Sequence, residues 1–416
     1  MPRLRWNSSL CVLAVFGALV VGLAQESAED RRQIAQEIES DLKVLKDITG
    51  LPVKKAISFE LITRDKVNQF LKDRIKDSTK PEEIRAEEVT LKKLGFAPPE
   101  FNLEKSTVDL LTEQAAAFYD YHKKKLFLTS WNPSAQEQSA LAHELGHALA
   151  DQNFHLERYI NQSGQSDDSG LARMAVMEGQ ATWLMTEVLA RKSGQSLFAN
   201  PSLLEAATGG AESATTEYPV FNSVPLYLRE TLVFPYTEGA RFQNAVVKKM
   251  GTAAFTEVFK RPPETSQQIL HPDKYFEHVK PSEPAFLPLS LEKGYKELIA
   301  GMLGELDHSI LLRQYGTTAQ AKAIAPHWKG GRYSIIENKK EARLVLKYVS
   351  EWDSPEVARE FFHFYKLVLQ KKWKKMEITS ESADTISGTG DDGYFLVKQT
   401  GAFVSSVEGL ESPYHR

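Results

Sequence analysis

The sequence has 416 residues, of which 42% are hydrophobic and 25% are charged, with a formal net charge of -4. These values are typical of globular proteins and exclude a collagen-like or coiled-coil composition. The near balance of 51 basic and 55 acidic residues gives no sign of the clustered positive charge of a nucleic-acid-binding protein, so no nucleic-acid partner is expected. The only cysteine, Cys11, excludes an intramolecular disulfide and a cysteine-based zinc site.

Residues 1–24 have the pattern of a secretory signal peptide. Arg3 and Arg5 precede an apolar run over 10–23, and small residues stand at Gly22 and Ala24. The run is short for a membrane-spanning helix, although an uncleaved anchor is the alternative. We therefore expect a secreted or periplasmic protein with no stable membrane span after cleavage. A secreted chain that has lost its only cysteine fits a bacterial periplasmic or extracellular protein.

The first half of the chain is predicted to be mainly helical. In chain order, hydrophobic periodicity and breaker residues predict a helix over 27–48, a strand over 53–62, helices over 65–77, 81–94 and 103–113, a β-hairpin over 115–129, and strong helices over 135–152 and 168–192.

The kind of predicted element changes towards the C-terminus, where strands become frequent. The predicted elements are a loop-rich stretch over 201–225, helices over 238–250 and 252–259, a proline-punctuated passage over 262–288, a mostly helical stretch over 292–315, strands over 332–337, 343–352, 394–398 and 402–407, and a helix over 354–373. The overall expectation is an α+β protein. A mainly helical region over 25–317 is followed by a small α+β unit over 318–416.

The segment Leu141-Ala142-His143-Glu144-Leu145-Gly146-His147 contains the pattern His-Glu-x-x-His in a helical, apolar context. Two histidines four residues apart lie on one helix face and can hold one metal ion together. Zinc prefers imidazole and carboxylate ligands in a tetrahedral set, and a catalytic site keeps one position open. Glu144 lies beside the metal and can take a proton from metal-activated water. The alternative is a buried helix with two hydrogen-bonded structural histidines.

A third protein ligand must be His, Asp or Glu, because the mature chain has no cysteine. Glu178 is the best candidate, since it interrupts an apolar helix and a lone buried carboxylate is costly unless it is paired or bound to metal. Pairing with Arg173 is the alternative for this carboxylate. His155 follows His147 too closely on the same helix to fold back.

These motifs resemble the zincin metallopeptidases of the gluzincin type, in which His-Glu-x-x-His is completed by a glutamate on a later helix, often as Glu-Gly-x-Ala. Glu178-Gly179-Gln180-Ala181 matches that second signature. The resemblance covers about residues 110–280, and the stretch from His147 to Phe154 looks like that of a group of poorly characterised secreted bacterial zincins. It implies a zincin-like catalytic domain in which His143, His147 and Glu178 hold one Zn²⁺ and Glu144 acts as general base.

The resemblance also implies further site features. A zincin edge strand lies above the zinc, and the hairpin over 117–128 is similar to it, so an extended substrate could pair there by strand addition. The run Phe234-Pro235-Tyr236-Thr237-Glu238-Gly239 resembles the Tyr-x-x-Gly helix start that supplies an oxyanion-stabilising tyrosine in the aminopeptidase branch. His271 is a second candidate for that role. Asp151, one turn after His147, could orient that histidine. The aspartate that thermolysin-like enzymes carry four residues after the ligand glutamate is replaced here by Thr182.

The resulting hypothesis is a secreted zinc metallopeptidase that hydrolyses peptide bonds in a peptide or protein substrate. The amine-binding Gly-x-Met-Glu-Asn motif of the aminopeptidase branch is absent from the sequence, which favours an endopeptidase. The alternatives are a catalytically inactive zincin-like protein that binds a peptide or envelope partner, and a structural zinc site closed by His122, His155 or His271.

Overall fold

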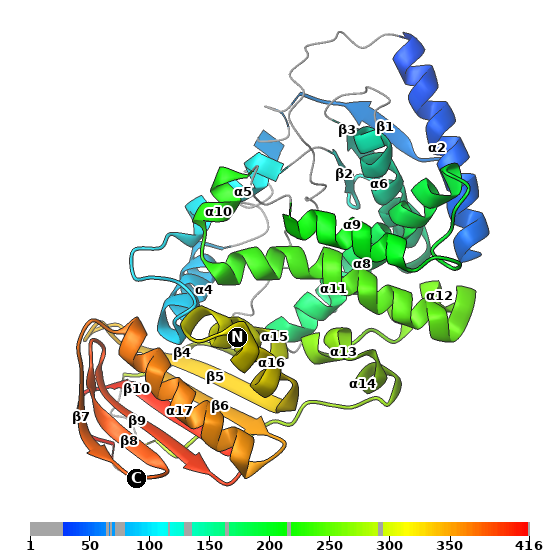
Figure 1. The fold of residues 1–416 in the computed structure, drawn as a ribbon. Coiled ribbons are helices and arrows are strands. Elements are labelled where there is room, and N and C mark those ends of the chain that lie inside the picture. The colour runs from blue at the N-terminus through cyan, green and yellow to red at the C-terminus, as the bar shows by residue number, and fades with distance from the viewer. Residues whose placement is uncertain are drawn as a thin grey trace.

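A computed structural model describes residues 28–63, 66, 69–70, 80–114, 117–128, 135–162, 166–213, 218–289 and 294–414. The predicted signal peptide, Cys11 and most of the predicted helix over 65–77 lie outside these residues. The protein is α+β, as expected, and Figure 1 shows a larger helical part above a C-terminal sheet. Within the described part of the chain, no helix combines the length and the apolar character that a membrane crossing needs.

Three long helices form the centre of the helical part. These are α6 (Ala135–Phe154), α8 (Asp167–Lys192) and α11 (Leu226–Met250), and α8 packs against both of the others. Most of α8 from Leu171 to Val188 is buried, because it is covered on several sides. The remaining helices of this part are α2 (Ala28–Thr49), α4 (Pro81–Leu94), α5 (Leu103–Gln114), α7 (Leu156–Asn161), α9 (Ser202–Ser213), α10 (Pro219–Ser223), α12 (Ala254–Lys260), α13 (Ser266–Leu270) and α14 (Pro272–Phe276).

A small three-stranded sheet lies beside α6 (Figure 1). Its order is β1 (Ser58–Leu61), β3 (Lys125–Leu128) and β2 (Ala117–Asp120), with β1 parallel and β2 antiparallel to β3. The hairpin of β2 and β3 confirms the prediction over 115–129. The segment before β1 stays attached to α6 through Gln152, whose Oε1 accepts the Lys54 N–H at 2.8 Å.

The C-terminal part is a seven-stranded antiparallel sheet in the order β4-β5-β6-β10-β9-β8-β7. Its elements are β4 (Lys296–Met302), α15 (Glu305–Tyr315), α16 (Thr318–Ile324), β5 (Trp328–Asn338), β6 (Arg343–Trp352), α17 (Pro355–Lys372), β7 (Met376–Glu381), β8 (Thr385–Gly390), β9 (Gly393–Thr400) and β10 (Phe403–Leu410). Helix α17 covers one face of the sheet (Figure 1). On the other face, Leu287 and Leu289 of the proline-rich passage pack against Ile336 and Val407.

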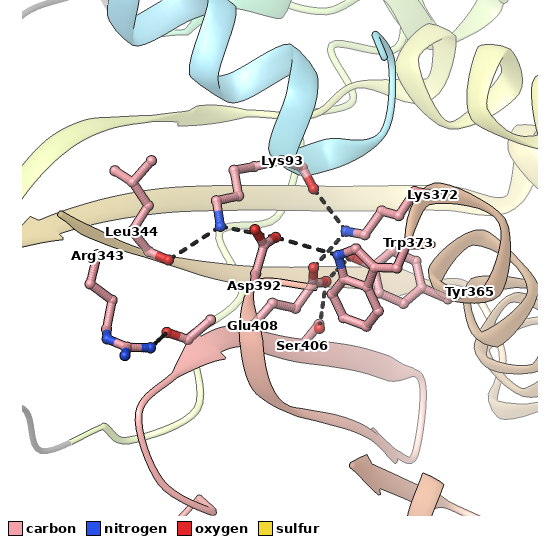
Figure 2. Close-up of polar contacts among 10 residues, drawn as sticks. Lys93, Arg343, Leu344, Tyr365, Lys372, Trp373, Asp392, Ser406 and Glu408 are labelled. Atoms are coloured by element: carbon pink, nitrogen blue, oxygen red, sulfur yellow. Dashed lines mark hydrogen bonds and ion pairs between the residues drawn. The ribbon is translucent and has the colours of Figure 1, made fainter. Parts of the chain in front are cut away.

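Helix α4 precedes the sheet by two hundred residues in sequence but is bound to it. Figure 2 shows Lys93 of α4 paired with Asp392 at 3.0 Å, while its backbone oxygen accepts from Lys372 Nζ at 2.8 Å. The same Lys372 forms an ion pair with Glu408, and the two side chains are 5% and 0% exposed. Such a pair is tolerable inside the protein only because every group has a partner.

Three predicted elements differ from the structure in type or extent. The loop-rich stretch over 201–225 contains α9 and α10, since Leu204 and Thr208 form a buried stripe one turn apart. The stretch over 292–315 is not mostly helical, because β4 occupies 296–302 before α15 begins at Glu305. The helix predicted over 238–250 starts at Leu226 and continues through Pro235. Strands β7 and β8 were not predicted, and β4 places the start of the sheet before residue 318.

Candidate metal centre

The two histidines of the His-Glu-x-x-His pattern lie on the same face of α6 and point towards α8. Helices α6 and α8 approach closely because Gly146 has no side chain, and a Cβ there would lie 3.3 Å from Ala181 Cα. This approach brings Glu178, in the middle of α8, to the imidazoles of His143 and His147. All three residues are buried, with exposures of 3% for His143, 8% for His147 and 1% for Glu178.

Three atoms form an almost equilateral triangle. The distance between His143 Nε2 and His147 Nε2 is 3.1 Å, and each of these nitrogens lies 3.1 Å from Glu178 Oε2. A tetrahedral zinc site with metal–ligand distances of about 2.0–2.1 Å separates its ligand atoms by about 3.3 Å. The triangle therefore fits three ligands of one small divalent cation.

Hydrogen bonding alone does not satisfy this triangle. For both imidazoles to donate to Glu178, each Nε2 must carry a hydrogen. The two N–H groups of His143 and His147 would then face each other across 3.1 Å with no acceptor between them. A cation among the three atoms removes this conflict, since each nitrogen offers it a lone pair.

Buried charge sets the proton affinities of the metal-free triad. Burial opposes ionisation of Glu178, but the adjacent imidazoles outweigh it and lower the pKa of the carboxyl to about 2. Burial likewise disfavours the charged form of His147, but the negative Glu178 raises the pKa of this imidazole to about 9. Burial lowers the pKa of His143. The metal-free centre thus holds a carboxylate and one imidazolium, and the imidazolium proton must leave when a metal binds.

Glu144 lies next to the triad and is 4% exposed. One carboxylate oxygen of Glu144 and one ring nitrogen each of His143 and His147 lie within 4.8 Å of one another. However, Glu144 Oε2 accepts the backbone N–H of Tyr119 at 2.7 Å, whereas Glu178 reaches both imidazoles directly. Glu178 is therefore better placed than Glu144 to be a third ligand of a metal ion held by the two histidines. Burial raises the pKa of Glu144 to about 8.

Tyr236 also lies at the centre. Its ring stacks on that of His143, with 5.9 Å between the centroids and 24° between the planes. The predicted place at a helix start is wrong, because Tyr236 lies in the middle of α11. It reaches His143 because α11 crosses α8 at two glycines. A Cβ on Gly179 would lie 2.1 Å from the Gly239 carbonyl carbon, so any larger residue would hold the helices apart.

Other predicted residues have partners elsewhere. His271 Nε2 lies 2.7 Å from Glu305 Oε1 and, within the described chain, makes no contact with the triad. Among the described residues, no hydrogen bond joins Asp151 to His147, and the Asp151 carboxylate accepts from Tyr119 Oη at 3.0 Å and Lys124 Nζ at 2.7 Å. His122 is paired with Glu157.

No fourth protein ligand closes the site among the residues that the structure describes. The potential metal-binding group found there comprises His143, Glu144 and His147, to which Glu178 adds its carboxylate. The arrangement favours an open coordination position, as a catalytic metal requires, over a closed structural site.

Strand β2 does not have the free edge that pairing with an extended substrate needs. All four residues of β2 are buried, and the outward N–H of Tyr119 is already bound to Glu144. A substrate strand can add here only if the groups that cover β2 move. Sequence reasoning missed this contact because it joins two segments 25 residues apart and uses a backbone group, which leaves no residue-type signal.

Comparison with known proteins gives a match only for the C-terminal sheet. A family model described as a domain of unknown function (DUF8575) matches residues 295–413, which agrees closely with the extent of the sheet from β4 to β10. No curated protein and no solved structure matches the chain. The matched segment contains none of the residues of the candidate centre, so the likeness to zincins depends on the motif and on the geometry.

Proposed function

We propose that this protein is a secreted, zinc-dependent metallopeptidase of zincin type that hydrolyses internal peptide bonds. The observation that carries the proposal is the buried triangle of His143, His147 and Glu178, with a fourth buried side chain, the carboxylate of Glu144, beside it. Secretion is proposed from the pattern of residues 1–24. A binding protein would need the triangle but would not need a base in this position.

His143, His147 and Glu178 would hold the ion. When bound, zinc there supplies Lewis acidity towards a peptide carbonyl and towards water. The positive charge also favours the ionised form of Glu144, which burial alone disfavours.

Glu144 then accepts a proton from the attacking water while the new C–O bond forms at the scissile carbonyl carbon. It returns that proton to the departing nitrogen when the C–N bond breaks. The Tyr119 N–H holds one carboxylate oxygen of Glu144 and leaves the other for this transfer. Tyr236, stacked on His143, is the residue we propose to donate a hydrogen bond to the developing oxyanion.

The test compares zinc-loaded wild type with the Glu144→Gln variant on a mixed peptide library read by mass spectrometry. Removing a general base costs about 10²–10⁴-fold in rate, so cleavage should be lost while zinc content stays at one ion per chain. Glu137→Gln, on the same helix, is the matched control and should cleave like wild type. Zinc binding without cleavage by wild type would support the inactive peptide-binding alternative.

A further inference from the structure

A cavity of about 490 Å³ lies between α11 and the pair α15–α16. This is within the range of pockets that bind small molecules or side chains, roughly 300–1,000 Å³. Much of its wall is apolar, with Val233, Phe234 and Leu306 among the lining residues. The cavity is therefore large enough to hold part of a ligand.

Arg229 is a charged residue of this wall whose hydrogen-bonding capacity is not fully used. Arg229 lines the cavity, and its Nε is buried without a hydrogen bond. The neighbouring carboxylates are taken by other arginines, since Glu230 is paired with Arg313 at 2.9 Å and Glu238 with Arg241 at 2.6 Å. Within the described residues, no ion pair neutralises Arg229. A buried Nε without an acceptor is costly, and a ligand in the cavity would supply that acceptor.

The position of Arg229 on α11 relates the cavity to the metal centre. Tyr236 follows Arg229 by seven residues, which is two helical turns, so both lie on the same side of α11. The rise of an α-helix places them about 10 Å apart along the axis. Tyr236 is the residue that stacks on His143. An extended peptide advances about 3.3 Å per residue, so about three residues span that distance.

We propose that Arg229 is a specificity residue that binds a carboxylate of the peptide substrate, about three residues from the bond that is cleaved. This inference depends on the proposed peptidase function. A guanidinium fork matches a carboxylate in two parallel hydrogen bonds, and the apolar wall accepts the side chains beside it. The carboxylate belongs to an acidic side chain or to the free end of the substrate, and the experiment separates these two sources.

The test measures binding by calorimetry to the zinc-loaded Glu144→Gln protein, so that turnover does not consume the probe. The probes are capped nine-residue alanine–leucine peptides that carry one Glu or one Gln at each position in turn. An uncapped version supplies the terminal carboxylate. We expect one position, or the free terminus, at which the carboxylate peptide binds at least roughly tenfold more tightly than its neutral counterpart.

Adding Arg229→Ala to the Glu144→Gln protein should reduce that ratio to about one. Arg229→Lys should keep part of it, because lysine retains the charge but not the fork. Arg359→Ala, an exposed arginine on α17, is the control that should leave the ratio unchanged. If Arg229→Ala unfolds in a thermal melt, Arg229→Met preserves the packing of the stem and replaces it in the test.

Two results would overturn the proposal: equal binding of Glu and Gln peptides at every position, or a preference for the carboxylate that survives removal of Arg229. If the affinity ratio of carboxylate to neutral peptide falls when Arg229 is replaced although wild type cleaves no peptide, that result would keep the carboxylate site and reject the peptidase. Cleavage by wild type without any carboxylate preference would keep the proposed peptidase and reject the carboxylate site.

Discussion

The contact between Gly179 and Gly239 makes the sharpest stability prediction. A Cβ on Gly179 would lie 2.1 Å from the carbonyl carbon and 2.3 Å from the carbonyl oxygen of Gly239. These are backbone atoms inside α11, so they can move only if the whole helix shifts. Overpacking of this kind costs about 3 kcal/mol, and the better helix propensity of alanine returns about 1 kcal/mol. Gly179→Ala should therefore lower the free energy of unfolding by about 2 kcal/mol.

Gly209→Ala is the matched control for this change. Gly209 also lies inside a helix, α9, but a Cβ there would meet nothing within 4 Å. This variant should gain about 0.5–1 kcal/mol, because alanine restricts the unfolded chain. Urea unfolding monitored by circular dichroism measures both values. The reasoning is refuted if Gly179→Ala unfolds at the same urea concentration as wild type, or if the two variants shift together.

Three further predictions concern charge. Burial raises the pKa of Asp307 to about 8 and that of Asp167 to about 7, and it raises the pKa of Glu87 well above its usual range. Their neutral forms stabilise the fold fully below about pH 4, and this contribution is lost as the pH rises towards 8. Glu87→Gln should thus match wild type in thermal stability at pH 4 and exceed it at pH 8; equal melting temperatures at both pH values would contradict this. Zinc binding at pH 7 should release at least one proton, because the pKa of metal-free His147 is about 9. Calorimetry in buffers of different ionisation enthalpy counts the protons, and a count of zero would disprove the assignment. Lys372→Met should cost about 3 kcal/mol because it leaves Glu408 buried without its cation. Exposed Lys374→Met should change stability by less than about 0.5 kcal/mol in the same denaturant titration.

Local pattern was enough to predict much of the centre. Helix α6 follows from an apolar run without breakers, and the four-residue spacing then requires His143 and His147 to share a face. Glu178 could be selected because a carboxylate in an apolar helix needs a partner, and it lies at both imidazoles. These inferences use only helix geometry and the cost of burying charge.

Tertiary contacts account for what the pattern did not predict. Proline at position 235 favours a break, yet α11 continues through it, because Phe234, Ala240 and Phe242 are buried in the core. The strands β7 and β8 are short and mostly exposed or half-buried, so they lack a continuous apolar signal. The link of α4 to the sheet through Lys93 depends on side chains far apart in sequence, which no local rule predicts.

The metal content of the purified protein tests the central assignment most directly. Atomic absorption after zinc loading and dialysis should give one zinc per wild-type chain. A competing chromophoric chelator should then show affinity at least roughly hundredfold lower for Glu178→Gln, which loses one of three ligands. Wild type without zinc, or Glu178→Gln with the affinity of wild type, would contradict the account.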